Sequence, residues 1–188
     1  MVTGTGKLEK AFLESPVIDK KGYPYFVNPV SDGIPLVEPE LLSEITDRLL
    51  ENAKLDCDLI LAPEAMGIHL ATAVSMRTGV PFAVIRKKQY GLPGEITLDQ
   101  QTGYSKSPMY INGVTEGMRV ALIDDVISTG GTMRAITRAL KEHGVTVSEI
   151  DVVYNKCKDL PALEEEMGVK VNYIIKVGVR GDKPVIIA

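Results

Sequence analysis

Residues 120–132, VALIDDVISTGGT, limit the fold of this chain more than any other segment. They begin with an apolar run, residues 120–123, that suits a strand buried on both faces, as the strands of parallel sheets are. Two carboxylates, Asp124 and Asp125, follow this strand, and a turn leads from them into a helix that starts near Gly130. Open α/β sheets bind ligands at the carboxyl ends of their parallel strands. The segment therefore predicts an α/β fold with a ligand site at this turn.

The turn is made of small residues that suit a phosphate group. They are Ser128, Thr129, Gly130, Gly131 and Thr132. Glycines allow backbone N–H groups to converge, hydroxyls add donors, and the start of a helix carries a partial positive charge. A phosphate can therefore be bound here without a basic side chain. A Gly-Gly pair or an Asp pair alone is also typical of an ordinary turn or N-cap, but both in this order indicate a site for a phosphorylated sugar.

Other kinds of site fit these residues less well. A Walker-type nucleotide loop requires a different spacing and a Lys before its Ser or Thr, and the dinucleotide pattern GxGxxG is missing from the chain. A metal hydrolase with paired Asp residues would leave the hydroxyl and glycine cluster without a role. A sugar-phosphate site accounts for every part of the segment.

The motif IDDVISTGGT resembles the 5-phosphoribosyl-1-diphosphate (PRPP) signature of the type I phosphoribosyltransferases. LILAPEAMG and RKKQYGLPGE resemble two further segments of the adenine-type members, the first being their pyrophosphate loop. SDGIPLVEPELL and GYSKSPMYINGV resemble the archaeal hypoxanthine/guanine phosphoribosyltransferases, which are adenine-type in sequence. The similarity covers roughly residues 15–177. It implies the type I fold: a central, mostly parallel sheet flanked by helices, a small hood formed by residues 1–35 and a mobile lid formed by residues 87–112.

A second strand-to-helix loop contains Glu64, Ala65, Met66 and Gly67. A small residue and a glycine in such a loop let main-chain N–H groups approach an anion, although a plain turn would have the same pattern. The resemblance implies that this loop holds the diphosphate of PRPP. Some adenine-type enzymes carry Arg where this chain has Met66. We therefore expect Mg²⁺ and other positive groups to neutralise the diphosphate.

Those positive groups follow the next strand. Arg86, Lys87 and Lys88 form a run of three cations at its carboxyl end, beside two loops that suit phosphates. We expect them to contact anions. In similar dimeric enzymes a basic residue of this region crosses to the active site of the neighbouring subunit, so the resemblance implies a homodimer. The sequence leaves open which lysine crosses.

Hydrophobic periodicity places strands and helices around these loops. It predicts strands over residues 58–62, 81–86, 119–124, 147–154 and 171–177, a possible strand at 184–188, and helices over residues 38–53, 68–78, 130–143 and 160–167. This alternation favours a parallel sheet with crossover helices. Residues 89–112 are polar and glycine-rich, which predicts an irregular, mobile lid. A β-hairpin packed away from the site is the alternative.

Length and composition fit one globular domain. The chain has 188 residues, of which 45% are hydrophobic and 24% charged, enough for a sizeable core. The net charge of −4 argues against a broad nucleic-acid surface. No run approaches the roughly 18 apolar residues of a membrane-spanning helix, and the N-terminus MVTGTGKLEK lacks the apolar run of a secretory signal. We therefore expect a cytoplasmic protein without membrane contact.

The resemblance implies Mg²⁺-dependent transfer of a ribosyl phosphate from PRPP to a purine. Asp124 and Asp125 would hold the ribose hydroxyls and favour the positive charge that develops on the sugar. Mg²⁺ would bridge diphosphate and ribose oxygens. Hypoxanthine-guanine enzymes of the other purine branch carry Asp where this chain has Ser128. The acid/base step at the purine is therefore left open between Glu95, Asp99 and a purine that is already anionic.

The expected reaction converts hypoxanthine or guanine to IMP or GMP and releases diphosphate. Adenine is the alternative base. A PRPP-sensing transcription regulator would share the fold but add a DNA-reading helix-turn-helix. The N-terminal flank of this chain contains no pair of helices with a basic recognition face, which disfavours that reading.

Overall fold

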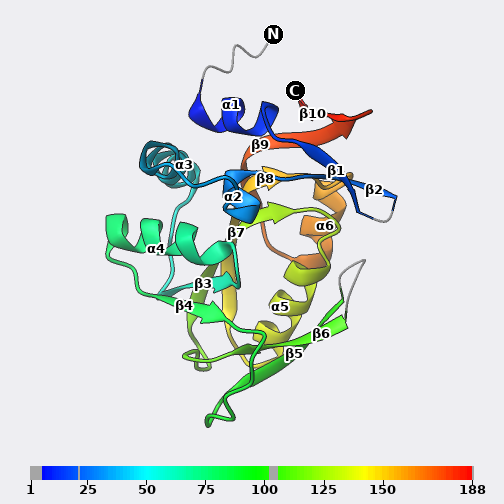
Figure 1. The fold of residues 1–188 in the computed structure, drawn as a ribbon. Helices are drawn as coiled ribbons and strands as arrows, with labels where there is room; N and C mark the ends of the chain where they lie inside the picture. Colours follow the sequence, from blue (N-terminus) through cyan, green and yellow to red (C-terminus); the bar gives the residue numbers. More distant parts are fainter. Residues whose placement is uncertain (1–5, 21, 102–105, 188) are drawn as a thin grey trace.

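The computed structural model describes residues 6–20, 22–101 and 106–187. Its centre is a six-stranded sheet in the order β10-β9-β8-β7-β3-β4 (Figure 1). The strands are β3 (Leu59–Pro63), β4 (Phe82–Ile85), β7 (Arg119–Ile127), β8 (Thr146–Asn155), β9 (Val171–Arg180) and β10 (Lys183–Ile186). All neighbouring pairs are parallel except β9 and β10. The mostly parallel sheet predicted from the sequence is confirmed.

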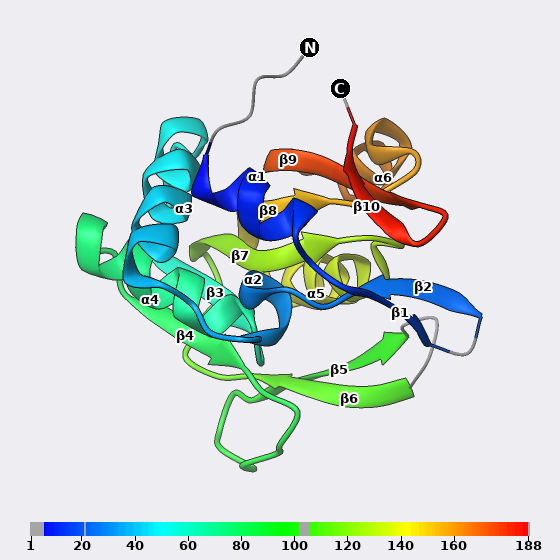
Figure 2. The same cartoon turned by 45° about the horizontal axis from the view of Figure 1, so that its top comes forward.

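Helices cover both faces of this sheet (Figures 1 and 2). One face carries α1 (Lys7–Leu13), α3 (Pro39–Asn52) and α4 (Gly67–Thr78), and the other carries α5 (Gly131–Glu142) and α6 (Leu160–Met167). A separate apolar cluster fills each face. Strand β7 contributes to both clusters, with Leu122 in one and Ile123 in the other. It is therefore buried on two sides, as its apolar run predicts.

Local signals explain where several elements begin and end. Pro161 stands in the first turn of α6, where its missing N–H costs no helical hydrogen bond. The Asp159 side chain caps this helix by accepting from the Ala162 N–H at 3.2 Å. Gly168 then ends the helix with φ 70°, a left-handed conformation that glycine adopts without strain. The observed bounds of α6 coincide with the predicted range.

The prediction of an irregular segment over residues 89–112 is wrong for half its length. Strands β5 (Ile96–Gln101) and β6 (Lys106–Ile111) form an antiparallel hairpin. Ile96 and Leu98 are buried and the residue between them is exposed, which is the period of a half-buried strand. The surrounding glycines and polar residues obscured this short alternation. Residues 102–105 of the expected lid lie outside the described residues, and its mobility stays a prediction.

The N-terminal segment lies over the carboxyl ends of the strands. It contains α1, a small hairpin of β1 (Val17–Lys20) and β2 (Tyr23–Phe26), and the short helix α2 (Pro29–Asp32) beside β7. Phe26 packs against Phe12 of α1 and Tyr154 of β8, with ring centroids 4.9 and 6.0 Å apart. These aromatic contacts fix the segment to the sheet. Within the described part of the chain, no helix has the length and apolar character needed to cross a membrane.

A buried acidic pair lies on β8. Glu149 accepts hydrogen bonds from the backbone N–H groups of Lys54 and Leu55. The Asn172 amide donates to Glu149 at 3.1 Å and to Asp151 Oδ1 at 2.9 Å. The other oxygen of Asp151 has no hydrogen-bond partner among the described residues. Burial, with a smaller contribution from the charge of Glu149, raises the pKa of Asp151 to about 7.

This raised pKa predicts that the protein becomes less stable as the pH rises. The folded state holds the Asp151 proton more tightly than the unfolded state, whose pKa is ordinary, so stability present below about pH 4 is lost between pH 4 and 7. Asp151→Asn keeps an acceptor for Asn172 and removes the buried charge. Urea unfolding should show this variant to be more stable than wild type at pH 8 by on the order of 2–4 kcal/mol.

Asp182→Asn is the matched control, because Asp182 lies exposed in the β9–β10 turn. It removes the same formal charge without relieving burial. A difference between Asp151→Asn and wild type that stays equal at pH 5 and pH 8 would contradict the prediction.

Candidate active site

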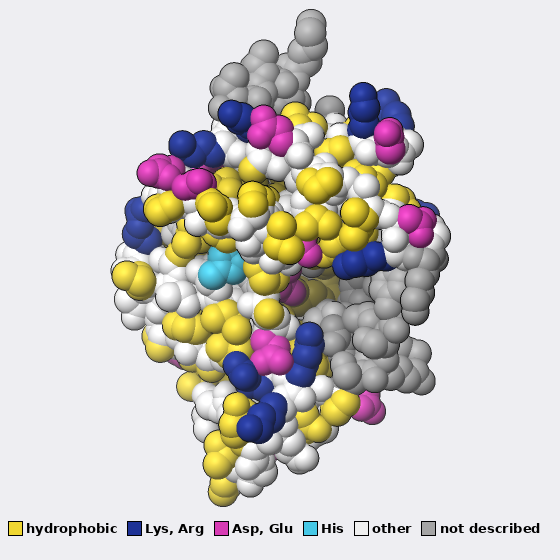
Figure 3. All heavy atoms as spheres, in the orientation of Figure 1, with side chains coloured by type: hydrophobic (Ala, Val, Ile, Leu, Met, Phe, Trp, Pro, Cys, Tyr) yellow, Lys and Arg dark blue, Asp and Glu magenta, His cyan; other side chains and the backbone are white. Residues whose placement is uncertain are grey.

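The two carboxylates predicted at the site lie within β7 rather than after it. Pairing with β8 continues to Ile127, which is opposite Asn155, so Asp124 and Asp125 are the sixth and seventh of the nine residues of the strand. The Asp125 N–H donates to Asp124 Oδ1 at 2.9 Å. Figure 3 shows acidic side chains inside a hollow on this face of the molecule and basic side chains around it.

Both carboxylates are disfavoured as ions in the free protein. Burial raises the pKa of Asp124 well above its ordinary value, and the charge of Asp125 adds to this effect, while the charge of Lys87 opposes it. Burial also raises the pKa of Asp125, and the Ser31 hydroxyl counteracts part of the rise. The two carboxylates therefore repel each other when ionised, and a bound cation or a positively charged ligand would reduce that repulsion.

Helix α2 contributes two neighbours of Asp125, Ser31 and Asp32, that were not predicted from the sequence to lie there. Asn28 caps this helix, its side chain accepting from the N–H groups of Val30 and Ser31 at 2.9 and 3.0 Å. The cap places the Ser31 hydroxyl near Asp125, without a hydrogen bond of ordinary geometry among the described residues. Asp32 adds a negative charge that raises the pKa of Asp125. No local signal links these residues to β7, because the contact is made only by the folded chain.

The turn of residues 128–132 joins β7 to α5. Gly130 is the N-cap residue with φ 77°, and Gly131 is the first residue of the helix. A Cβ atom on Gly130 would lie 2.6 Å from Leu163 Cδ2 of α6, so the left-handed backbone and the close packing both require glycine. Ser128 is partly exposed and Thr129 exposed. Thr132 lies in the first turn of α5. The turn therefore presents backbone and hydroxyl groups at a helix start, as predicted.

The loop of residues 64–67 joins β3 to α4 and lies directly beside Asp124. The Glu64–Ala65 peptide is cis, Ala65 is exposed, and Met66 is the N-cap residue of α4. A Cβ atom on Gly67 would lie 2.7 Å from the Ile123 carbonyl oxygen and 3.3 Å from Asp124 Oδ1. Glycine is thus required for the close approach of this loop to the carboxylates, and the structure brings the predicted loop beside the predicted acidic pair.

The three predicted cations differ in their surroundings. Arg86 Nε lies 2.9 Å from Glu64 Oε2, an ion pair without hydrogen-bond alignment, and the Arg86 backbone pairs with Tyr110 of β6. Lys87 is exposed and close enough to lower the pKa of Asp124. Lys88 is also exposed, with its Nζ 5.6 Å from the ring centroid of Tyr90. Lys87 is therefore the cation that the fold directs toward the acidic pair.

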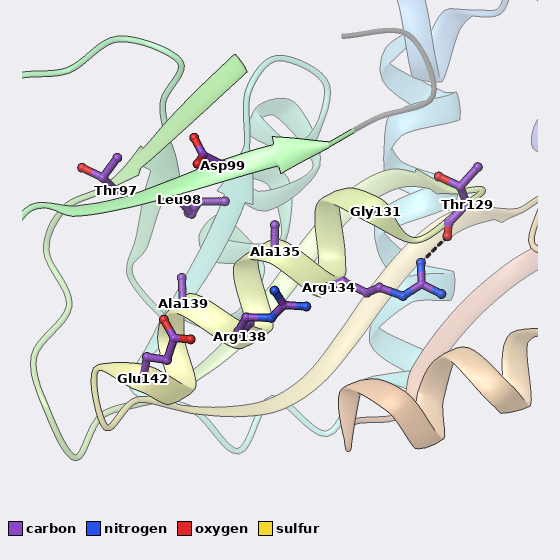
Figure 4. Close-up of a pocket in the computed structure, with 10 residues that line it drawn as sticks. All are labelled: Thr97, Leu98, Asp99, Thr129, Gly131, Arg134, Ala135, Arg138, Ala139 and Glu142. Carbon is purple, nitrogen blue, oxygen red and sulfur yellow. Dashed lines mark hydrogen bonds between the residues drawn. The ribbon is translucent and has the colours of Figure 1, made fainter. Parts of the chain in front are cut away.

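The two carboxylates considered for proton transfer, Glu95 and Asp99, lie in different surroundings. Glu95 accepts from the Asn112 amide at 2.9 Å and from two backbone N–H groups, and the bond from Asn112 is the main cause of its lowered pKa. Asp99 lines a cavity of about 620 Å³ between β5 and the outer side of α5 (Figure 4). The hairpin thus packs on α5 and borders the 128–132 turn, which also corrects the alternative of a hairpin packed away from it.

The acidic pair could hold a hard cation only with help from a ligand. No cluster of three His, Cys, Asp or Glu side chains suited to a metal occurs among the described residues. Asp124 and Asp125 offer carboxylate oxygens with unrelieved negative potential. Mg²⁺ prefers oxygen ligands and retains waters or substrate phosphates beside one or two carboxylates. The donor set fits Mg²⁺ in that mode.

Comparison with known proteins identifies the family. The model of the phosphoribosyl transferase domain matches residues 40–179. A hypoxanthine/guanine phosphoribosyltransferase of Methanohalophilus mahii is 47% identical over 93% of this chain and 92% of its own length. One of Methanothermus fervidus is 51% identical over 92% of both. The crystal structure of adenine phosphoribosyltransferase from Thermoanaerobacter pseudethanolicus superimposes with a TM-score of 0.71 and 27% identity, over 90% of this chain and 99% of that one. The chain belongs to the phosphoribosyltransferase family.

Proposed function

We propose that this protein is a purine salvage enzyme that transfers the ribosyl phosphate of PRPP to hypoxanthine or guanine. The products are IMP or GMP and diphosphate. One observation carries the proposal: an acidic pair, a glycine-rich turn at a helix start and a second strand-to-helix loop meet at the carboxyl end of one parallel sheet. The relatives that align over almost the whole chain carry the name hypoxanthine/guanine phosphoribosyltransferase.

In this assignment each loop binds one end of PRPP. The 128–132 turn receives the 5-phosphate through backbone N–H groups and hydroxyls at the start of α5. The 64–67 loop receives the diphosphate, and Gly67 lets it lie against β7. Lys87 adds positive charge, while Arg86 is held by Glu64 and orients the end of β4. The ribose then lies over Asp124 and Asp125.

The acidic pair supports the chemical step through its field. Diphosphate leaves C1 as the purine nitrogen attacks the opposite side, and positive charge builds on the ribose ring. Asp124 and Asp125 accept hydrogen bonds from the ribose hydroxyls and favour that charge, because burial weakens competing solvation. Bound Mg²⁺ would polarise the diphosphate oxygens and stabilise the leaving group. Water, which would otherwise attack the ribosyl group, must be excluded from the site while the substrates are bound.

The purine fits a cavity of about 870 Å³ that is bordered by the 128–132 turn, α6 and β9. Its walls include Pro24, Ser128, Lys156, Lys176 and Val177. Two carboxylates also line it, but Asp159 caps α6 and Glu166 pairs with Arg134. Ammonium groups only donate hydrogen bonds, so this lining suits the O6 acceptor of a 6-oxopurine better than the amino group of adenine.

We also infer that the enzyme is a homodimer, as the resemblance of its basic segment to dimeric relatives implies. We infer separately that it is cytoplasmic.

The base preference is the first test of this proposal. Hypoxanthine, guanine and adenine should be supplied together with Mg²⁺ and limiting PRPP, and the nucleotides separated. IMP and GMP should each form at least about tenfold faster than AMP, because an unpaired edge group costs about 1.4 kcal/mol or more. AMP as the main product would overturn the assignment in favour of an adenine enzyme.

Removal of the acidic pair is the second test. Asp124→Asn with Asp125→Asn should lower the transferase rate by at least about 100-fold. The melting temperature should stay similar or rise, since two buried like charges are removed. Asp47→Asn, at an exposed position of α3, is the control and removes one carboxylate outside the site. Near-normal turnover in the double variant would show that the carboxylates do not act on the ribosyl transition state.

A further inference from the structure

Arg134 lies in the first turn of α5 and makes two hydrogen bonds, one to the 128–132 turn and one to α6. Its Nη1 donates to the carbonyl oxygen of Thr129 at 2.5 Å (Figure 4). Its Nε donates to Glu166 Oε2 of α6 at 2.6 Å. The guanidinium is planar and its donors have fixed directions, so a bond at Nε also fixes where Nη1 points. Glu166 therefore orients the group that holds Thr129.

The bond to Thr129 also orients a backbone donor of the turn. In a trans peptide the C=O and the following N–H point in opposite directions. Holding the Thr129 carbonyl toward Arg134 thus directs the Gly130 N–H away from Arg134. Leu163 of α6 supports the same peptide from behind, because it occupies the place of a Cβ on Gly130. Two helices consequently fix the direction of one donor in a turn that contains no cation.

We propose that Arg134 is a positioning residue for the 5-phosphate of PRPP: it holds the 128–132 turn in its binding conformation from outside, with Glu166 as its support. This inference rests on the proposed function of the turn. The 5-phosphate gains and loses no bonds or charge in the reaction, so we expect its contacts with the turn to contribute equally to the ground state and the transition state. Loss of the positioning should raise KM for PRPP and leave kcat nearly unchanged.

The test compares variants of the full-length protein by steady-state kinetics and by calorimetric titration with ribose 5-phosphate, a probe without base or diphosphate. Arg134→Ala should raise both KM for PRPP and Kd for ribose 5-phosphate about tenfold, with kcat within about twofold of wild type. Arg134→Lys should not restore affinity, because an ammonium lacks the fork that bonds Thr129 and Glu166 together. Glu166→Gln should weaken binding in the same direction by about two- to threefold.

Arg138→Ala is the matched control. Arg138 lies one turn further along α5, is exposed, and lines the same cavity as Arg134 without contacting the turn in any described interaction (Figure 4). Its removal should leave both affinities unchanged. Thermal melting of each variant separates loss of binding from loss of folding, and Glu166→Gln keeps the test informative if Arg134→Ala unfolds.

Three results would overturn the positioning role. They are unchanged affinity for ribose 5-phosphate in Arg134→Ala, full recovery in Arg134→Lys, and equal losses in Arg138→Ala and Arg134→Ala. The last two would mean that bare positive charge acts on the phosphate. A wild-type protein that neither binds ribose 5-phosphate nor forms IMP would instead refute the proposed function, so the two failures are distinguishable.

Discussion

Burial of β7 between β3 and β8 is the constraint on which the site depends. Its apolar residues 120–123 are buried between apolar clusters on the two faces, and pairing with β8 does not stop there but continues to Ile127. Asp124 and Asp125 are therefore held in a strand that the core has already fixed, with their carboxylates partly removed from water. An acidic pair on a loop could move apart or turn to solvent. Here the hydrogen bonds of the sheet oppose both movements, and the repulsion between the two groups is retained in the free protein.

This arrangement separates two electrostatic tasks that lie a few residues apart. In the proposed function, the carboxylates create negative potential where positive charge develops on a sugar, whereas the turn beyond them accepts an anion. Residues 128–132 do so without a basic side chain, so no lysine or arginine within the turn neutralises the acidic pair beside it. Backbone N–H groups at a helix start act over a short range and in a fixed direction. Lys87 follows a different strand, β4, so its positive charge acts on Asp124 independently of the 128–132 turn.

Much of this was predictable from the sequence because it is local. The apolar run before Asp124, the Gly-Gly turn and the capped helix α6 each depend on neighbouring residues, and each lies where it was expected. The hairpin β5–β6 was expected only as the alternative to an irregular lid, because its alternation spans only a few residues and its burial depends on α5. Ser31 beside Asp125 and Glu64 beside Arg86 could not be found in this way. Those contacts join segments far apart in the chain, and periodicity carries no information about them.

The same limit applies to the residues that give the turn its shape. A sequence motif records the groups that could touch a phosphate, but a backbone donor binds well only if its direction is fixed before the ligand arrives. In the proposed arrangement that direction is set by Leu163, Arg134 and Glu166, of which two belong to α6, outside the motif. A turn that binds a phosphate through its backbone therefore depends on the residues packed behind it more than a turn that binds a phosphate through a flexible cationic side chain does. Helix α6 has no role in the proposed chemistry itself, yet under the positioning proposed for Arg134 it determines how well the chain can hold the phosphate end of PRPP.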